Sequence, residues 1–142
     1  YDQTAIMILS DHGIGYNAHN KPDSDLFPAM GRAMAFMMVK PFNASGPFKP
    51  TDAPVSLVDV PATVADMLDL SLPFNGQSVL TIPEDAVRER RYHFYPLSRR
   101  DWASGKMPHP TTVYTVIGHA WENASWKSQK TITQNEVGDG PL

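Results

Sequence analysis

The sequence contains no cysteine, no long hydrophobic run and no excess of positive charge. Without cysteine, disulfides and cysteine-ligated zinc sites are excluded, and either redox compartment is compatible with the chain. The longest apolar runs fall far short of the roughly 20 residues that a membrane-spanning helix needs. A formal net charge of −3 gives no basic footprint, so we expect no nucleic-acid partner. The apolar fraction of 42% argues against disorder, and 142 residues are enough to bury a core.

The most informative stretch lies near the beginning of the chain. A strand-length apolar run, Thr4–Leu9, ends in the tetrapeptide Ser-Asp-His-Gly, residues 10–13. Such a run predicts a strand covered on both faces. Ligands of open α/β sheets lie beyond the carboxyl ends of the strands, and an Asp with a neutral His suits Zn²⁺ or Mn²⁺. Asp11 and His12 are therefore candidate metal ligands. The alternative is a polar turn in which Asp11 caps a helix and His12 lies at the surface.

A second block downstream strengthens the first interpretation. It begins Ala-Pro-Val-Ser at residue 53 and is followed by Pro-Phe-Asn-Gly-Gln-Ser, residues 73–78. Together with the Ser-Asp-His-Gly turn, this order of motifs resembles the C-terminal half of the sulfatase-like branch of the alkaline phosphatase superfamily. That branch holds sulfatases and phosphoglycerol or phosphoethanolamine transferases. The resemblance covers roughly residues 1–80.

The resemblance implies an α/β fold with two parts. Residues 1–80 would be the C-terminal part of a sulfatase-like catalytic domain, an alkaline-phosphatase-like sheet sandwiched by helices. Residues 81–142 would form a small C-terminal α+β subdomain with an antiparallel sheet. The parent enzyme would act outside the cytoplasm or in the cell envelope, with a membrane anchor upstream as one possibility.

The implied activity is hydrolysis or transfer at a sulfate or phosphate ester, carried on a glycan or a lipid. In such enzymes Asp11 and His12 would ligate a divalent metal ion, Mn, Zn or Ca, which polarises the ester. The family's nucleophile lies upstream of the Asp-His pair, and this chain contains no Ser-x-Pro-x-Arg motif or its cysteine form. We therefore expect a fragment that lacks the N-terminal half of its parent and is inactive alone.

His19 and Lys21 lie in the polar, irregular segment Ile14–Gly31 that follows the pair. Long segments without their own structure are often functional. The resemblance implies that a His or Lys here contacts the anionic ester group, where a cation stabilises developing charge. The family's usual Lys-Thr-x-x-Tyr-Glu pattern is not matched after Lys21, and an exposed position in a loop explains both residues equally well.

Other local patterns predict the remaining elements. Ala33–Val39 predicts a second apolar strand, and Asp59 with Pro61 predicts the N-cap and first turn of a helix. An apolar face at helical spacing, expected in the core, consists of Val60, Val64, Met67 and Leu68. The charge order of Glu84–Arg91 predicts a short helix.

Three later segments predict a small antiparallel sheet: Arg91–Leu97, Thr111–Ile117 and Trp126–Thr133.

Two alternatives remain open. In the first alternative, the chain is a non-catalytic module that binds glycan or a protein partner through its C-terminal sheet and tryptophans. In the second, a degenerate pseudo-enzyme would keep the fold without a metal.

In a fragment, the two N-terminal strands would lose sheet neighbours contributed by the missing half. Exposed apolar edges of that kind predict self-association.

Overall fold

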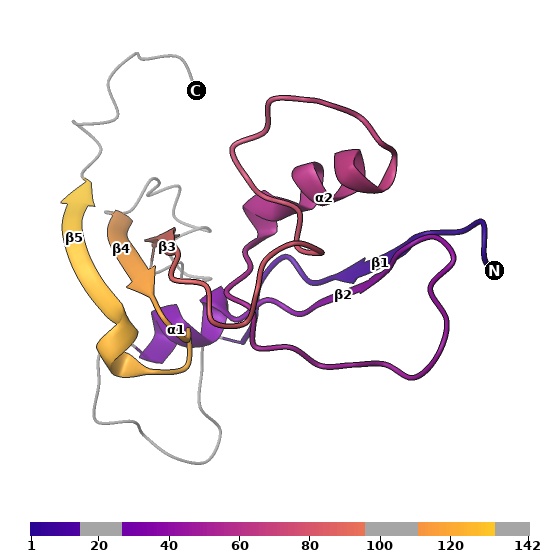
Figure 1. The fold of residues 1–142 in the computed structure, drawn as a ribbon. Helices are drawn as coiled ribbons and strands as arrows, with labels where there is room; N and C mark the ends of the chain where they lie inside the picture. Colours follow the sequence, from indigo (N-terminus) through magenta and orange to yellow (C-terminus); the bar gives the residue numbers. More distant parts are fainter. Residues whose placement is uncertain (15–26, 96–110, 133–142) are drawn as a thin grey trace, which may run out of the picture. The chain divides into compact units, whose positions relative to one another are not determined.

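The computed structural model describes residues 1–14, 27–95 and 111–132 (Figure 1). The chain divides into two compact units, Tyr1–Arg88 and Glu89–Leu142. The described residues form a mixed α/β structure with two small antiparallel sheets and few helices. None of the helices in these segments has the length and apolar character needed to cross a bilayer. The larger sandwich that the resemblance implies stays a prediction.

The first unit contains a two-stranded antiparallel sheet. Its strands are β1 (Ile6–Leu9) and β2 (Met37–Lys40), which lie side by side in Figure 1. The Lys40 ammonium at the end of β2 donates hydrogen bonds to the carbonyls of Tyr1 and Thr4, at 3.0 and 2.9 Å. These contacts hold the N-terminal residues against the sheet.

Both N-terminal strands are shorter than predicted, and β1 is more exposed. Ile8 and Leu9 are 52% and 41% exposed, so the prediction that β1 is covered on both faces is wrong for the described chain. The second strand begins at Met37 because Ala33 is still helical. It ends helix α1 (Phe27–Ala33), which also occupies the last part of the predicted loop.

A short 3₁₀ turn, η1 (Leu57–Asp59), runs directly into helix α2 (Val60–Met67). Pro61 lies in the first turn as predicted, where a missing N–H costs nothing. Val64 and Leu68 are 39% and 52% exposed. The buried residues of the helix are instead Thr63 and Ala65. The prediction that the apolar face packs in the core is therefore wrong for the described residues, because no described segment covers all of that face.

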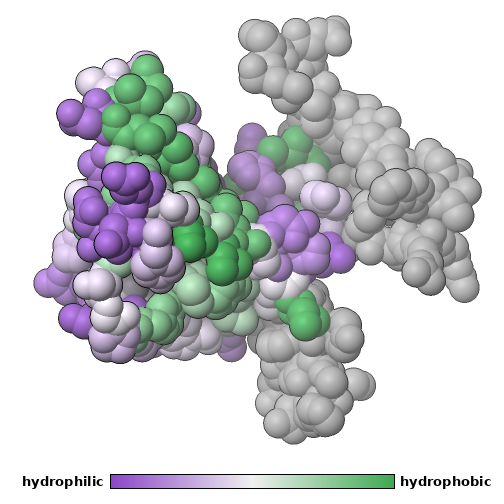
Figure 2. Space-filling view, turned by 90° about the vertical axis from the view of Figure 1, so that its right-hand side faces the viewer, coloured by the Kyte–Doolittle hydropathy of each residue, from purple (hydrophilic) through white to green (hydrophobic). Residues whose placement is uncertain are grey.

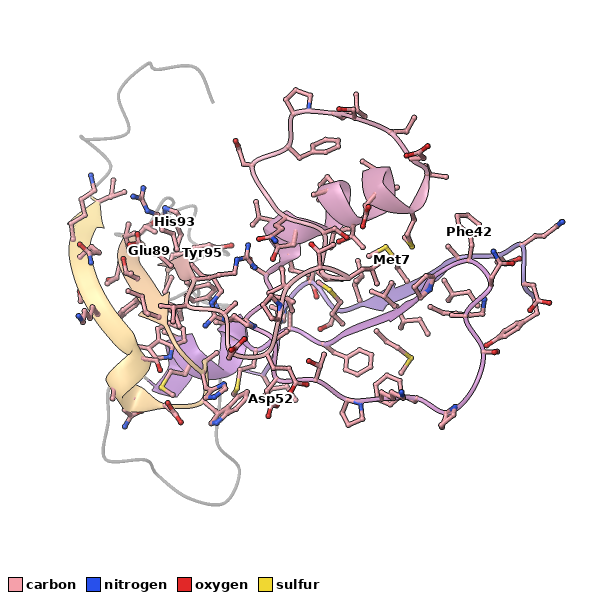
Figure 3. The ribbon with its side chains drawn as sticks, in the orientation of Figure 1. Met7, Phe42, Asp52, Glu89, His93 and Tyr95 are labelled. Carbon is pink, nitrogen blue, oxygen red and sulfur yellow. The ribbon has the colours of Figure 1, made fainter. Side chains whose placement is uncertain are left out.

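Large hydrophobic side chains are exposed in several parts of the first unit. Figure 2, which shows the side on which the N-terminus lies, displays apolar residues in adjoining patches. Exposed examples are Ile6, Phe36, Phe48, Leu70 and Leu72. Another is Phe42, labelled in Figure 3 on the connection between β2 and η1. Exposed apolar patches mark contact surfaces or aggregation sites. Self-association stays a prediction that these patches favour.

The second unit contains the predicted three-stranded antiparallel sheet, with β4 in the centre (Figure 1). Its strands are β3 (Glu89–Phe94), β4 (Thr111–Ile117) and β5 (Trp126–Ile132). The predicted helix over Glu84–Arg91 is wrong, because its last residues already belong to β3. Burial alternates residue by residue along that strand, as expected for a strand with one face covered.

The core of this sheet is built around one tryptophan. Trp126 is only 6% exposed, and its indole meets the rings of Tyr92 and Tyr114 edge-on. The ring centroids lie 5.9 and 5.6 Å from that of Trp126. Edge-to-face contacts at such distances stabilise aromatic clusters beyond their buried area. On β3, Tyr92 is half-buried, whereas Glu89 and His93, labelled in Figure 3, are exposed.

Candidate metal centre

The Ser-Asp-His-Gly turn leaves β1 between two anchored residues. The Ser10 N–H donates to the Phe36 carbonyl at 2.9 Å, and the Phe36 N–H donates to Ser10 Oγ at 2.7 Å. At the other end, the Gly13 N–H donates to the Arg32 carbonyl at 2.8 Å. A Cβ on Gly13 would lie only 2.2 Å from the Gly31 carbonyl oxygen, so glycine alone fits this close approach. The backbone on both sides of the Asp-His pair is therefore fixed.

The two predicted ligands lie on this turn with exposed side chains. The exposed fractions are 89% for Asp11 and 64% for His12. Asp11 Oδ1 accepts a hydrogen bond from the His12 N–H at 3.0 Å, and Asp11 Oδ2 lies 3.7 Å from His12 Nε2. His12 Nδ1 lies 2.6 Å from the Gly13 carbonyl oxygen. Because a carbonyl only accepts, a hydrogen bond between these atoms needs a proton on Nδ1. The tautomer with its one proton there leaves Nε2 with the lone pair that binds metals.

The spacing of the two atoms fits neighbouring positions on one cation. Two ligands, each ~2.1 Å from a zinc ion at the tetrahedral angle, lie ~3.4 Å apart. The observed distance between Asp11 Oδ2 and His12 Nε2 is 3.7 Å, slightly longer than this value. No cluster of three or more His, Asp or Glu residues that could hold a metal occurs in residues 1–14, 27–95 and 111–132. In these segments Asp11 and His12 therefore have no third metal-ligating side chain beside them.

His19 and Lys21, predicted to contact the ester group, lie outside the described residues. The structure therefore describes Asp11 and His12 side by side. It gives no position for the side chains of His19 and Lys21.

A second polar cluster surrounds Asp59, whose side chain is completely buried. Its Oδ1 accepts from the Gln77 N–H at 2.9 Å and from Arg88 Nη2 at 2.8 Å. Its Oδ2 accepts from the Ser56 N–H at 2.8 Å and from Arg88 Nη1 at 2.9 Å. Arg88 Nη1 also donates to the Pro54 carbonyl at 2.9 Å. With four donors on its two oxygens, this carboxylate has no position left for a ligand.

These contacts hold the pKa of Asp59 below its ordinary value of 3.8. Burial is the largest single influence and raises the pKa. Four smaller influences lower the pKa and together outweigh burial. They are the hydrogen bond from the Arg88 side chain, the hydrogen bonds from the N–H groups of Gln77 and Ser56, and the positive charge of Arg88. The hydrogen bond to Asp59 likewise raises the pKa of Arg88, against the effect of burial. Both groups are therefore charged at neutral pH and form a fixed ion pair.

Asp59 is the N-cap residue of α2, as the sequence predicted, but its carboxylate does not cap that helix. The carboxylate instead closes a capping box with Ser56 around η1. The pairing with Arg88 was missed because the two residues are 29 positions apart and no local pattern links them.

A cavity of about 350 Å³ lies between α2 and the segment 70–81. Its polar residues include Asp66 and Ser78, and the Ser78 hydroxyl donates to Asp66 Oδ2 at 2.5 Å. Leu70, Leu72 and Phe74 provide much of the remaining wall. The cavity includes neither Asp11 nor His12, so it is not the metal centre that the sequence predicts.

Comparison of the chain with protein-family models, curated proteins and solved structures gives no match. The likeness to sulfatase-like enzymes therefore rests on the sequence motifs alone.

Proposed function

We propose that Asp11 and His12 supply two ligands of a divalent-metal centre in a sulfatase-like enzyme that acts on sulfate or phosphate esters. The observation that carries this proposal is the pairing of Asp11 Oδ2 and His12 Nε2, 3.7 Å apart on a turn fixed at both ends. The contact between His12 Nδ1 and the Gly13 carbonyl supports it further, because it would orient the ring and leave Nε2 available to a cation.

The chemistry of the two groups suits such a site. When bound, a divalent cation polarises the ester and stabilises negative charge on its oxygens. Asp11 would supply a charged, hard oxygen and His12 a neutral nitrogen, the mixture that Zn²⁺ and Mn²⁺ accept. The remaining ligands, and the nucleophile that the resemblance places upstream, would come from outside the described residues. The ester would be carried on a glycan or lipid outside the cytoplasm.

We also propose that β1 and β2 belong to a larger, alkaline-phosphatase-like sheet. The exposed side chains of Ile8 and Leu9 on β1 support this, because further strands and covering helices would bury them. The exposed Val64 on α2 and Leu68 directly after this helix support it in the same way. An ordinary soluble domain rarely leaves so many large apolar residues in contact with water.

Metal binding by the full 142-residue chain tests the ligand assignment. Titrating Mn²⁺ into ¹⁵N-labelled protein should broaden the amide signals of residues 10–13 first, through paramagnetic relaxation. Asp11→Ala and His12→Ala should each weaken this effect at least tenfold. The matched controls are Asp52→Ala and His93→Ala, which remove the same residue types at exposed positions elsewhere. Broadening that is equal in all four variants, or absent from residues 10–13, would overturn the proposal.

A second measurement concerns the ester group. Inorganic phosphate stands for the transferred group, and its ³¹P signal should broaden when phosphate, Mn²⁺ and the protein are combined. The broadening should exceed that of phosphate and Mn²⁺ alone and should disappear in Asp11→Ala. A phosphate signal that the protein does not affect would separate a metal-binding turn from an ester-binding site.

A further inference from the structure

The connection between β4 and β5 presents an exposed aromatic pair. The rings of His119 and Trp121 stack, with centroids 4.5 Å apart and planes inclined by 12°. Trp121 is 55% exposed, in contrast to the buried Trp126 five positions later. The imidazole stacks on one face of the Trp121 indole and leaves the opposite face as the one a ligand could cover. A flat apolar surface of this kind is unfavourable in water and favours a ligand that covers it.

The backbone around Trp121 is held in place before any ligand arrives. The indole N–H of Trp126 donates to the Ala120 carbonyl at 2.9 Å, so a core residue fixes the position directly before Trp121. The Glu122 N–H donates to the His119 carbonyl at 3.1 Å and closes a turn around Trp121. The stacked His119 ring restricts the indole from one side. Because these contacts already order the side chain, binding would cost little conformational entropy.

We propose that this turn is a carbohydrate-binding platform, on which the C–H face of one pyranose ring stacks against Trp121. A pyranose has an apolar face to cover the indole and a rim of hydroxyl groups that need hydrogen-bond partners. Glu122 and Asn123 follow directly and are both exposed, offering carboxylate and amide groups for such hydroxyls. The inference is independent of the metal centre at Asp11 and His12.

A protein partner fits these observations less well. The core of a protein interface is apolar and rich in large hydrophobic residues. In the described part of the second unit, the large hydrophobic residues that are exposed are only Tyr95, Ile117 and Trp121. A single aromatic ring beside polar residues matches the demands of a sugar ring better than those of a protein surface.

Binding of oligosaccharides to the full chain tests the proposal. Cellohexaose, chitohexaose and mannohexaose are titrated separately while the indole ¹⁵N–¹H signals and tryptophan fluorescence are recorded. At least one of them should shift the Trp121 indole signal saturably, with a Kd of about 1 mM, as a small contact surface implies. Trp121→Ala should weaken binding at least tenfold. The matched control, Tyr95→Ala, removes another exposed aromatic ring of the same unit and should leave the affinity unchanged.

Two further variants keep the test decisive. Trp121→Phe retains a flat ring and should bind more weakly than the native chain but better than Trp121→Ala. His119→Ala frees the second face of the indole and should weaken binding two- to fivefold through loss of orientation. Circular dichroism and thermal unfolding check that each variant is folded. No saturable shift with any of the three sugars, or binding that survives Trp121→Ala, would overturn the proposal.

Discussion

Asp59 and Asp11 belong to the same unit but differ in almost every physical respect. Asp59 is completely buried and accepts hydrogen bonds from Ser56, Gln77 and Arg88. The side chain of Asp11 is 89% exposed and accepts a hydrogen bond from the neighbouring His12 N–H. A carboxylate with all its acceptor positions filled stabilises the fold. A carboxylate on a fixed backbone with an exposed side chain retains the capacity to bind a ligand.

The largest effect on stability should come from Asp59→Asn. The substitution removes the charge opposite Arg88 and places an amide N–H₂ among groups that all donate. Breaking one side of a buried ion pair costs about 3 to 5 kcal/mol in free energy of unfolding. Urea denaturation followed by circular dichroism measures the loss, and the exposed Asp52→Asn is the control. Equal midpoints for the two variants would show that the cluster contributes nothing to the fold.

Acid should weaken the same cluster by a smaller amount. Because the pKa of Asp59 is lowered in the folded chain, the unfolded chain takes up the proton first as the pH falls. The stabilisation is therefore complete when the pH is well above 3.8, the ordinary pKa of an Asp carboxyl. It is lost progressively as the pH falls through the lower pKa of Asp59 in the folded chain. Urea midpoints between about pH 6 and about pH 2 should fall more steeply for the native chain than for Asp59→Asn. Parallel curves would contradict this assignment.

Gly13→Ala should have an intermediate effect on stability. It should also weaken metal binding, so that one substitution changes both properties. The added Cβ would meet the Gly31 carbonyl, a backbone group that cannot rotate away. Overpacking of this kind costs about 1 to 3 kcal/mol, and here it would also displace the Asp-His pair. We expect a lower urea midpoint together with at least tenfold weaker Mn²⁺ binding. Ile14→Ala, at the next and 68% exposed position, should change neither quantity.

Local sequence signals predicted the elements that depend mainly on local structure. Thr111–Ile117 is β4 with the predicted bounds, and Pro61 lies in the first turn of the predicted helix. The prediction failed over Glu84–Arg91, where the charge order favoured a helix. Charges at helix ends are worth only about 0.3 to 1 kcal/mol, so the pairing of Arg88 with Asp59 and the strand that follows outweigh them.

The candidate sites were predictable by residue type but not by geometry. Asp11 and His12 stood out because an apolar run ended in them. The contact of His12 Nδ1 with the Gly13 carbonyl and the anchoring of the Gly13 N–H depend on backbone carbonyls that no sequence pattern identifies. The same limit applies to the tryptophans. Trp121 and Trp126 lie in similar sequence surroundings, and only the paired strands decide which one is exposed.

The smallest effect on stability should come from the residues proposed to carry the function. Asp11→Asn and His12→Ala remove exposed side chains, so the free energy of unfolding should change by no more than about 0.5 kcal/mol. Added Mn²⁺ should distinguish these variants from the native chain by their urea midpoints. A cation that binds only the folded state raises the midpoint, and it raises it more the tighter it binds. Mn²⁺ should therefore stabilise the native chain and the Asp52→Asn control, but neither of these two variants. If Asp11→Asn destabilised the metal-free chain as much as Asp59→Asn, the turn would be a structural element. The contrast between the two aspartates would then no longer support a metal centre.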